Sequence, residues 1–149
     1  MTRGESPGSR IHLRVRYAET DQMGRAHHMH YLAWFELGRT ELIRGTGMAY
    51  ADMERQGTML PVSHVEVEYR RGAGYDELVE IETRVSEVRS RTVTFSYRAT
   101  GAEDGELLAT GSTRLVCTDP AGRPTRIPDA ARATLRELAS EAAEAEEGP

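Results

Sequence analysis

The residues best suited to catalysis lie between Tyr17 and Tyr31, directly before a segment with helical periodicity. This stretch contains the carboxylate of Asp21, a turn glycine at Gly24, and histidines at positions 27, 28 and 30. The first N–H groups of a helix have no partner within the helix, and they carry partial positive charge. A carboxylate and imidazoles beside such donors form a site that can polarise a carbonyl group.

Each of these residues also has a purely structural interpretation. Asp is favoured in turns and at helix N-caps, so Asp21 by itself predicts a loop residue as readily as a catalyst. Tyr17 fits the last inward position of a strand as well as a site. The histidines suggest a metal centre, but side chains two residues apart on a helix face different ways, and no cysteine supports them. We therefore predict no metal site.

Composition restricts the class of protein. The 149 residues suffice for one domain with a moderate core. The net charge of −5 argues against a general nucleic-acid binder, and the basic residues are arginines, which suit discrete phosphate contacts. A single cysteine, Cys117, leaves no internal disulfide framework and favours a reducing compartment. No segment approaches the roughly 18 apolar residues of a membrane span, and the first ten residues lack an apolar signal segment. We expect a cytoplasmic protein without a membrane span.

Periodicity predicts the elements that position these residues. Residues 11–17 alternate apolar and polar side chains, which is typical of a half-buried strand. Between residues 28 and 45 the apolar positions recur every three or four residues, which predicts an amphipathic helix. Gly38 lies on its apolar side, where a glycine is tolerable if the helix backbone passes close to a sheet. The other predicted elements are a helix at 49–56, strands at 62–70, 78–88, 92–100 and 107–118, and a helix opening at 128–129.

The order of these elements indicates one α+β domain. Short turns between the last four strands favour antiparallel neighbours. A single long helix with one apolar face suggests a five-stranded sheet that curls around it. We place the domain at 11–140, with a flexible leader at 1–10 and an acidic, frayed tail at 141–149.

The motif between Tyr17 and Arg39 resembles that of the acyl-CoA thioesterases of the 4-hydroxybenzoyl-CoA thioesterase type. The shared pattern is Tyr17-x-x-Thr20-Asp21-x-x-Gly24-x-x-x-His28-x-x-Tyr31, followed by Trp34-Phe35-Glu36 and Arg39, and the similarity extends from about residue 14 to residue 128. The resemblance implies the hotdog fold, with a largely antiparallel sheet wrapped around one central helix. It also implies an acyl-CoA substrate, no cofactor apart from the coenzyme A of that substrate, and a homodimer or tetramer whose sites draw on two chains.

Taken residue by residue, the resemblance makes Asp21 the catalytic carboxylate, with Tyr17 and His28 as its companions. A thioester carbonyl is already electrophilic, so its hydrolysis needs a polarising donor and a carboxylate that attacks the carbon or activates water. The backbone N–H near His28 is the expected donor. Both roles of Asp21, nucleophile and general base, remain open.

The chain departs from the family pattern around the same segment. Arg25-Ala26 stands where relatives have a small aliphatic pair, and His30 stands where they have Asn. An imidazole is bulkier than an amide and titrates near neutrality, which changes the polarity of the pocket. We place Gly24 and His30 among the residues that contact the substrate.

Coenzyme A carries a 3′-phosphate and a pyrophosphate, which arginines bind well. The best candidates are Arg89, Ser90 and Arg91, at a tight turn between two predicted strands. Arg126 and the pair Arg70-Arg71 are second choices. A charged hairpin that deters strand pairing at the sheet edge is the alternative interpretation of any one of these arginines.

Two other functions are compatible with the predicted fold. A hotdog hydratase or dehydratase is expected to carry a different constellation of His with Glu or Asp. A non-catalytic acyl-CoA-binding or assembly protein would have kept the fold but lost turnover, and the intact Asp21 motif speaks against it.

Overall fold

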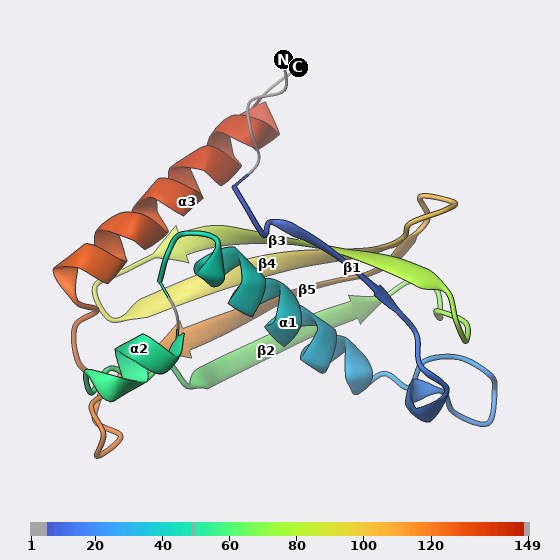
Figure 1. Ribbon diagram of the computed structural model, residues 1–149, viewed down its shortest axis with the longest axis horizontal. Helices are drawn as coiled ribbons and strands as arrows, with labels where there is room; N and C mark the ends of the chain where they lie inside the picture. The colour runs from blue at the N-terminus through green and yellow to red at the C-terminus, as the bar shows by residue number, and fades with distance from the viewer. Residues whose placement is uncertain (1–5, 49, 148–149) are drawn as a thin grey trace.

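The computed structural model describes residues 6–48 and 50–147 of the chain (Figure 1). Its elements follow one another in the predicted order. They are β1 (Arg10–Arg14), η1 (Tyr17–Glu19), α1 (His30–Arg44), α2 (Tyr50–Arg55), β2 (Val62–Tyr69), β3 (Leu78–Val88), β4 (Thr92–Gly101), β5 (Leu107–Val116) and α3 (Asp129–Glu147). No helix in these ranges is long and apolar enough to cross a membrane.

The five strands form one antiparallel sheet with the order β1-β3-β4-β5-β2. Strands β3, β4 and β5 are consecutive neighbours, because short turns join them in sequence. Among the described residues, β2, the first strand after α2, pairs with β5 alone and lies at an edge of the sheet. Helix α1 runs across one face of this sheet, and α3 packs against β3 (Figure 1). The predicted α+β architecture is confirmed.

The hydrophobic core fills the space between α1 and the sheet. Every second residue is buried along β4 and along β3 from Val79 to Val85, as the alternation predicts for strands with one covered face. The ring of Phe35 on α1 stacks on that of Tyr97 on β4, with 4.5 Å between the centroids. Most of the largest fully buried side chains come from α1, β3, β4 and β5, and they include Tyr31, Trp34, Phe35, Leu42, Ile81, Phe95, Leu108 and Leu115.

Gly38 allows α1 to approach the sheet closely. A Cβ atom at this position would lie 2.4 Å from Oγ1 of Thr83 and 3.0 Å from Cγ2 of Ile81, both on β3. Any larger residue would therefore push the helix off the strand. The prediction that this glycine marks a close helix–sheet contact is confirmed.

Residues 6–10 are packed, in contrast to the flexible leader predicted at 1–10. The carbonyl of Ser9 accepts a hydrogen bond from the backbone N–H of Thr83 at 2.8 Å, and β1 already begins at Arg10. Gly8, with φ of +82°, lies so close to α1 that a Cβ atom would be 2.2 Å from the carbonyl oxygen of Glu41. Residues 1–5 lie outside the described residues.

The final helix is also longer than predicted. Helix α3 continues to Glu147, so most of the segment expected to fray at 141–149 is helical. Its buried side chains Ala131, Leu135 and Leu138 recur at spacings of four and three residues, which places one stripe of the helix against the core.

Candidate active site

The loop that carries Asp21 is a tight turn built around the Asp21 side chain. The backbone of Asp21 donates to the carbonyl of Arg25 at 2.8 Å, and Gly24 returns a hydrogen bond to the Asp21 carbonyl at 3.0 Å. Oδ1 of Asp21 accepts the N–H of Met23 at 2.9 Å and that of Arg25 at 3.4 Å. Gly24 has φ of +74°, which explains a glycine at this point of the turn. The structural interpretation of Asp21 as a turn residue thus describes its geometry, and its catalytic role stays a prediction.

The second carboxylate oxygen of Asp21 is available for chemistry. Within residues 6–48 and 50–147, no hydrogen bond or ion pair engages Oδ2 of the half-buried Asp21 side chain. The turn thus holds one oxygen in place and leaves the other free, which is what a positioned base or nucleophile requires.

The loop at Asp119 has the same hydrogen-bonded turn as the loop at Asp21, but its second carboxylate oxygen has different neighbours. Oδ1 of Asp119 accepts the N–H groups of Ala121 and Arg123 at 2.9 and 3.0 Å, and Gly122 again has a positive φ, of +85°. However, Oδ2 of Asp119 faces the Arg123 guanidinium at 3.7 Å. The turn geometry alone therefore does not mark a catalyst, whereas the position of Asp21 just before α1 sets it apart.

The start of α1 provides an unpaired backbone donor. The helix begins at His30, two residues later than predicted, with Met29 as its N-cap. The N–H of His30 donates to the carbonyl of His27 at 3.1 Å, and the N–H of Met29 donates to Nδ1 of His27 at 3.2 Å. The N–H of His28 has no hydrogen-bond partner in the described part of the chain. The His28 side chain is exposed, and its ring lies 4.1 Å from that of His27.

A buried carboxylate that sequence reasoning missed holds this loop against α1. Glu19 is 5% exposed and accepts the indole N–H of Trp34 at 2.9 Å and the backbone N–H of Arg16 at 2.8 Å. The carbonyl of Glu19 accepts the N–H of His27 at 2.8 Å. Burial by itself raises the pKa of Glu19, but these hydrogen bonds and the Arg16 guanidinium outweigh it and hold the pKa below its usual range. The sequence feature that could have pointed to a buried acceptor such as Glu19 is Trp34, because the N–H of an indole in the core needs a hydrogen-bond acceptor.

Two tyrosines fix the start of α1 from the other side. The hydroxyl of Tyr69, on β2, donates to the carbonyl of His28 at 2.8 Å. The hydroxyl of Tyr31 accepts the N–H of Ala73 at 3.3 Å, and the two tyrosine rings meet edge to face at 5.2 Å. Burial raises the pKa of both Tyr31 and Tyr69, so their hydroxyl groups stay protonated at neutral pH. Strand alternation does not reveal this role of Tyr69.

Tyr17 lies outside the strand that was predicted to contain it. Strand β1 ends at Arg14, and the chain turns into η1 because the Glu19 carboxylate captures the backbone N–H of Arg16. The Tyr17 side chain is 78% exposed, and its ring meets only that of Tyr75, at 5.8 Å, among the described residues. The interpretation of Tyr17 as an inward strand residue is therefore wrong.

The other predicted residues of this segment occupy different settings. Gly24 is exposed in the Asp21 turn, and His30 is half-buried in the first turn of α1, with its ring edge-on to that of His27 at 6.3 Å. Across the ranges described, no three His, Cys, Asp or Glu side chains are grouped so as to hold a metal ion.

The predicted coenzyme A residues lie together, but far from Asp21. Ile127 donates from its backbone to the carbonyl of Ser90 at 2.9 Å, which brings Arg126 beside the turn that carries Arg89 and Arg91. All four predicted residues are exposed. The Arg89 side chain pairs with Glu87, whereas the Arg91 guanidinium has no ion pair within the described ranges.

This cluster and the Asp21 loop are at opposite ends of β3 (Figure 1). The Asp21 loop bridges to Gly74, just before β3, and the Arg89 turn follows its last residue, Val88. A strand of 11 residues extends about 34 Å at roughly 3.4 Å per residue. One chain therefore does not bring both halves of the predicted site together.

Arg71 is not available for a phosphate group. Its guanidinium lies 2.8 Å from Glu77, 3.1 Å from Asp104 and 2.8 Å from Glu106. Hydrogen bonds from Arg71 hold the pKa of Glu77 below its usual range, although burial opposes this. Arg70 is likewise paired, with Glu68 at 2.9 Å. These contacts contradict the choice of Arg71 as a second phosphate ligand, because three carboxylates would repel the anion.

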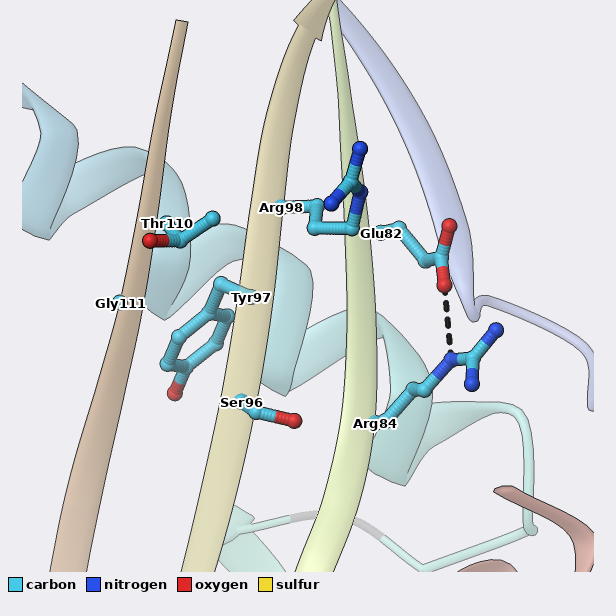
Figure 2. A pocket seen from close by; sticks show the side chains of 7 residues that line it. All are labelled: Glu82, Arg84, Ser96, Tyr97, Arg98, Thr110 and Gly111. Atoms are coloured by element: carbon cyan, nitrogen blue, oxygen red, sulfur yellow. Dashed lines mark hydrogen bonds and ion pairs between the residues drawn. The ribbon is translucent and has the colours of Figure 1, made fainter. Parts of the chain in front are cut away.

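A hollow of about 470 Å³ lies on strands β3, β4 and β5, and α1 lies behind these strands in Figure 2. Most of its lining residues are polar, and Glu82 and Arg84, both on β3, form an ion pair of 2.7 Å on one side of it (Figure 2). None of the predicted site residues lines it. Its lining residues are Glu82, Arg84, Ser96, Tyr97, Arg98, Thr110 and Gly111.

Comparison with known proteins identifies the family. The model of the thioesterase-like superfamily matches residues 15–135. The acyl-CoA thioesterase YbgC of Haemophilus influenzae is 30% identical over 128 residues, which cover 85% of this chain and 93% of that protein. The acyl-CoA thioester hydrolase YbgC of Escherichia coli O157:H7 is 32% identical over 108 residues, which cover 72% and 80% of the two chains.

A solved structure agrees with this assignment. The DHNA-CoA thioesterase from Staphylococcus aureus superposes with a TM-score of 0.82 at 35% identity, covering 93% of each chain. The fold is therefore the hotdog fold of the thioesterases. The protein belongs to the thioesterase-like superfamily, and the predicted resemblance is confirmed.

We expect Glu19→Gln to lower the free energy of unfolding by about 1–3 kcal/mol at pH 7, because an amide NH₂ must then face buried donors. The folded-state pKa of Glu19 is depressed, so its stabilising contribution is complete above the ordinary carboxyl value of 4.5. That contribution is lost as the pH falls through the folded-state pKa. Urea unfolding between pH 7 and pH 3 should therefore show the gap between wild type and variant shrinking below about pH 4.5.

The matched control is Glu54→Gln, on an exposed position of α2. It should change stability little at any pH. A gap for Glu19→Gln that stays constant with pH would show that the charge of Glu19 does not hold the loop.

Proposed function

We propose that this thioesterase hydrolyses acyl-CoA thioesters to a free acid and coenzyme A in the cytoplasm. The main support for this proposal is the Asp21 carboxylate, in which the turn binds one oxygen and leaves the other without a partner. Asp21 lies in the loop that leads to the unpaired N–H of His28. The names of the relatives, as acyl-CoA thioesterases, support the substrate class.

The two groups divide the reaction between them. The His28 N–H, at the positive end of α1, donates to the thioester carbonyl oxygen and stabilises the negative charge that develops there. Oδ2 of Asp21 either takes a proton from the attacking water or adds to the carbonyl carbon itself. In both routes the C–S bond breaks. In the first route Asp21 passes the proton taken from water to the sulfur of coenzyme A, and in the second route coenzyme A leaves as the thiolate, which takes its proton from solvent water. In the second route, water then hydrolyses the mixed anhydride and frees Asp21.

A second copy of the chain supplies the coenzyme A contacts in this proposal. An antiparallel partner joined along β2 would bring its Arg91 and Arg126 to the end of the sheet where Asp21 lies, because a two-fold axis reverses the strand direction. Strand β2 is at an edge, and two of its apolar residues, Val65 and Tyr69, are 49% and 45% exposed. Exposed apolar side chains on such an edge favour pairing with another strand.

Loss of the Asp21 charge should abolish turnover without unfolding the loop. Asn keeps the Oδ1 acceptor of the turn, so Asp21→Asn should lower kcat by at least about 100-fold with KM nearly unchanged. The measurement is thiol release from a panel of benzoyl, phenylacetyl, short and long aliphatic CoA esters.

Asp119→Asn provides the control for this variant, since Asp119 occupies an equivalent turn. It should leave kcat and KM as in wild type. Turnover by Asp21→Asn within a few-fold of wild type would overturn the catalytic assignment, and a wild type inactive on the whole panel would overturn the proposed substrate class.

The arginine contacts should affect binding alone. Arg91→Ala should raise KM for acyl-CoA about tenfold, the equivalent of roughly 1.4 kcal/mol, because its effect is equal in the ground and transition states. Arg89→Ala should do less, since Arg89 already pairs with Glu87. With acyl-N-acetylcysteamine, which lacks the nucleotide, Arg91→Ala and wild type should not differ.

Arg136→Ala, on exposed α3, is the control and should behave as wild type with both substrates. An equal loss on both substrate types would mean that Arg91 supports the fold and does not contact the nucleotide.

The molecular mass in solution tests the proposed assembly of two or more chains. Sedimentation equilibrium at micromolar concentration should give a dimer or tetramer. Val65→Arg should shift the protein toward monomer by placing a charge on the exposed edge, and kcat should fall with the dimer fraction. A wild-type monomer that is fully active would rule out a site shared between chains.

A further inference from the structure

We propose that His27 is the positioning residue that presents the His28 N–H to the thioester carbonyl. This inference rests on the proposed function. His27 would act through the backbone, by satisfying the N–H groups of Met29 and His30 and leaving that of His28 free.

Helix α1 lacks an ordinary cap. Its N-cap residue is Met29, whose side chain makes no capping hydrogen bond, and its first turn contains no acidic residue. Helices usually begin with Ser, Thr, Asp or Asn at this position, because these side chains accept the first backbone N–H groups. His27 takes over this role from two residues upstream, since its Nδ1 accepts the N–H of Met29 at 3.2 Å.

The same residue satisfies a second donor and is itself held in place. The carbonyl of His27 accepts the N–H of His30 at 3.1 Å, while its own N–H donates to the carbonyl of Glu19 at 2.8 Å. Among the N–H groups of residues 28–30, only that of His28 lacks a hydrogen-bond partner in the part of the chain described here. His27 thus satisfies the two donors that follow the N–H of His28 and leaves that N–H for a ligand.

This arrangement requires one protonation state of the His27 ring. A nitrogen that accepts a hydrogen bond carries no proton, so His27 must be neutral, with its proton on Nε2. The rings of His28 and His30 lie 4.1 and 6.3 Å from that of His27, and the ring of Tyr69 on β2 lies 6.3 Å from that of His28. A proton on Nδ1 would oppose the Met29 N–H and add positive charge at the positive end of α1.

Two substitutions separate the acceptor from the ring. His27→Phe keeps an aromatic ring beside His28 but removes Nδ1. His27→Asn removes the ring but places Oδ1 near the position of Nδ1, and Asn is a favoured helix cap. We expect His27→Phe to lower kcat about tenfold with KM within about twofold, because the donor acts mainly on charge in the transition state. His27→Asn should restore kcat to within about threefold of wild type.

The decisive experiment combines these kinetics on acyl-CoA with ¹⁵N NMR of the wild-type imidazoles. We expect an unprotonated Nδ1 and a protonated Nε2 on His27. Wild-type kcat in His27→Phe, equal losses in both variants, or a protonated Nδ1 would each overturn the proposal.

The NMR measurement and the Asn variant remain informative if the Phe variant does not fold. A wild type without activity on any acyl-CoA would refute the proposed function instead. In that case the tautomer of His27 and the exchange protection of the Met29 amide would still test the cap.

Discussion

The buried carboxylate of Glu19 is the interaction on which the candidate site depends. It ties the segment before the Asp21 turn to Trp34 in the middle of α1, while its backbone carbonyl holds His27. A buried charge is stable only when hydrogen bonds replace its hydration, and Glu19 receives them from an indole, a backbone N–H and a nearby guanidinium. Because the partners belong to both the loop and the helix, the carboxylate sets the position of Asp21 relative to the start of α1.

The two aspartate turns separate what the nearby sequence fixes, the hydrogen bonds of the turn, from what the rest of the fold fixes, the neighbours of the second carboxylate oxygen. Asp21 and Asp119 accept the same pattern of backbone hydrogen bonds from residues two and four positions ahead. In the Asp21 turn the second oxygen has no partner among the described residues, and in the Asp119 turn it faces an arginine. The chain therefore uses the same turn twice, and the surroundings of the second carboxylate oxygen differ between the two.

The length of the sheet separates the two halves of the predicted site within one chain. The Asp21 loop and the arginine turn lie at the two ends of β3, and the edge strand β2 leaves exposed apolar side chains. In the assembly that we propose, a two-fold axis turns this separation into proximity, because the ends of antiparallel partners exchange places. The proposed dimer thus completes the site that a single chain leaves divided.

The sequence by itself determined the elements, their order and the local turn at Asp21, because alternation, helical spacing and turn chemistry depend on residues close together in the chain. It also indicated the close approach of α1 at Gly38. Only the tertiary structure decided that Glu19 is buried against Trp34, that Tyr69 holds the His28 carbonyl, and that three carboxylates occupy Arg71. These contacts join residues far apart in sequence, and they leave no periodic pattern because each depends on how the sheet curves around the helix.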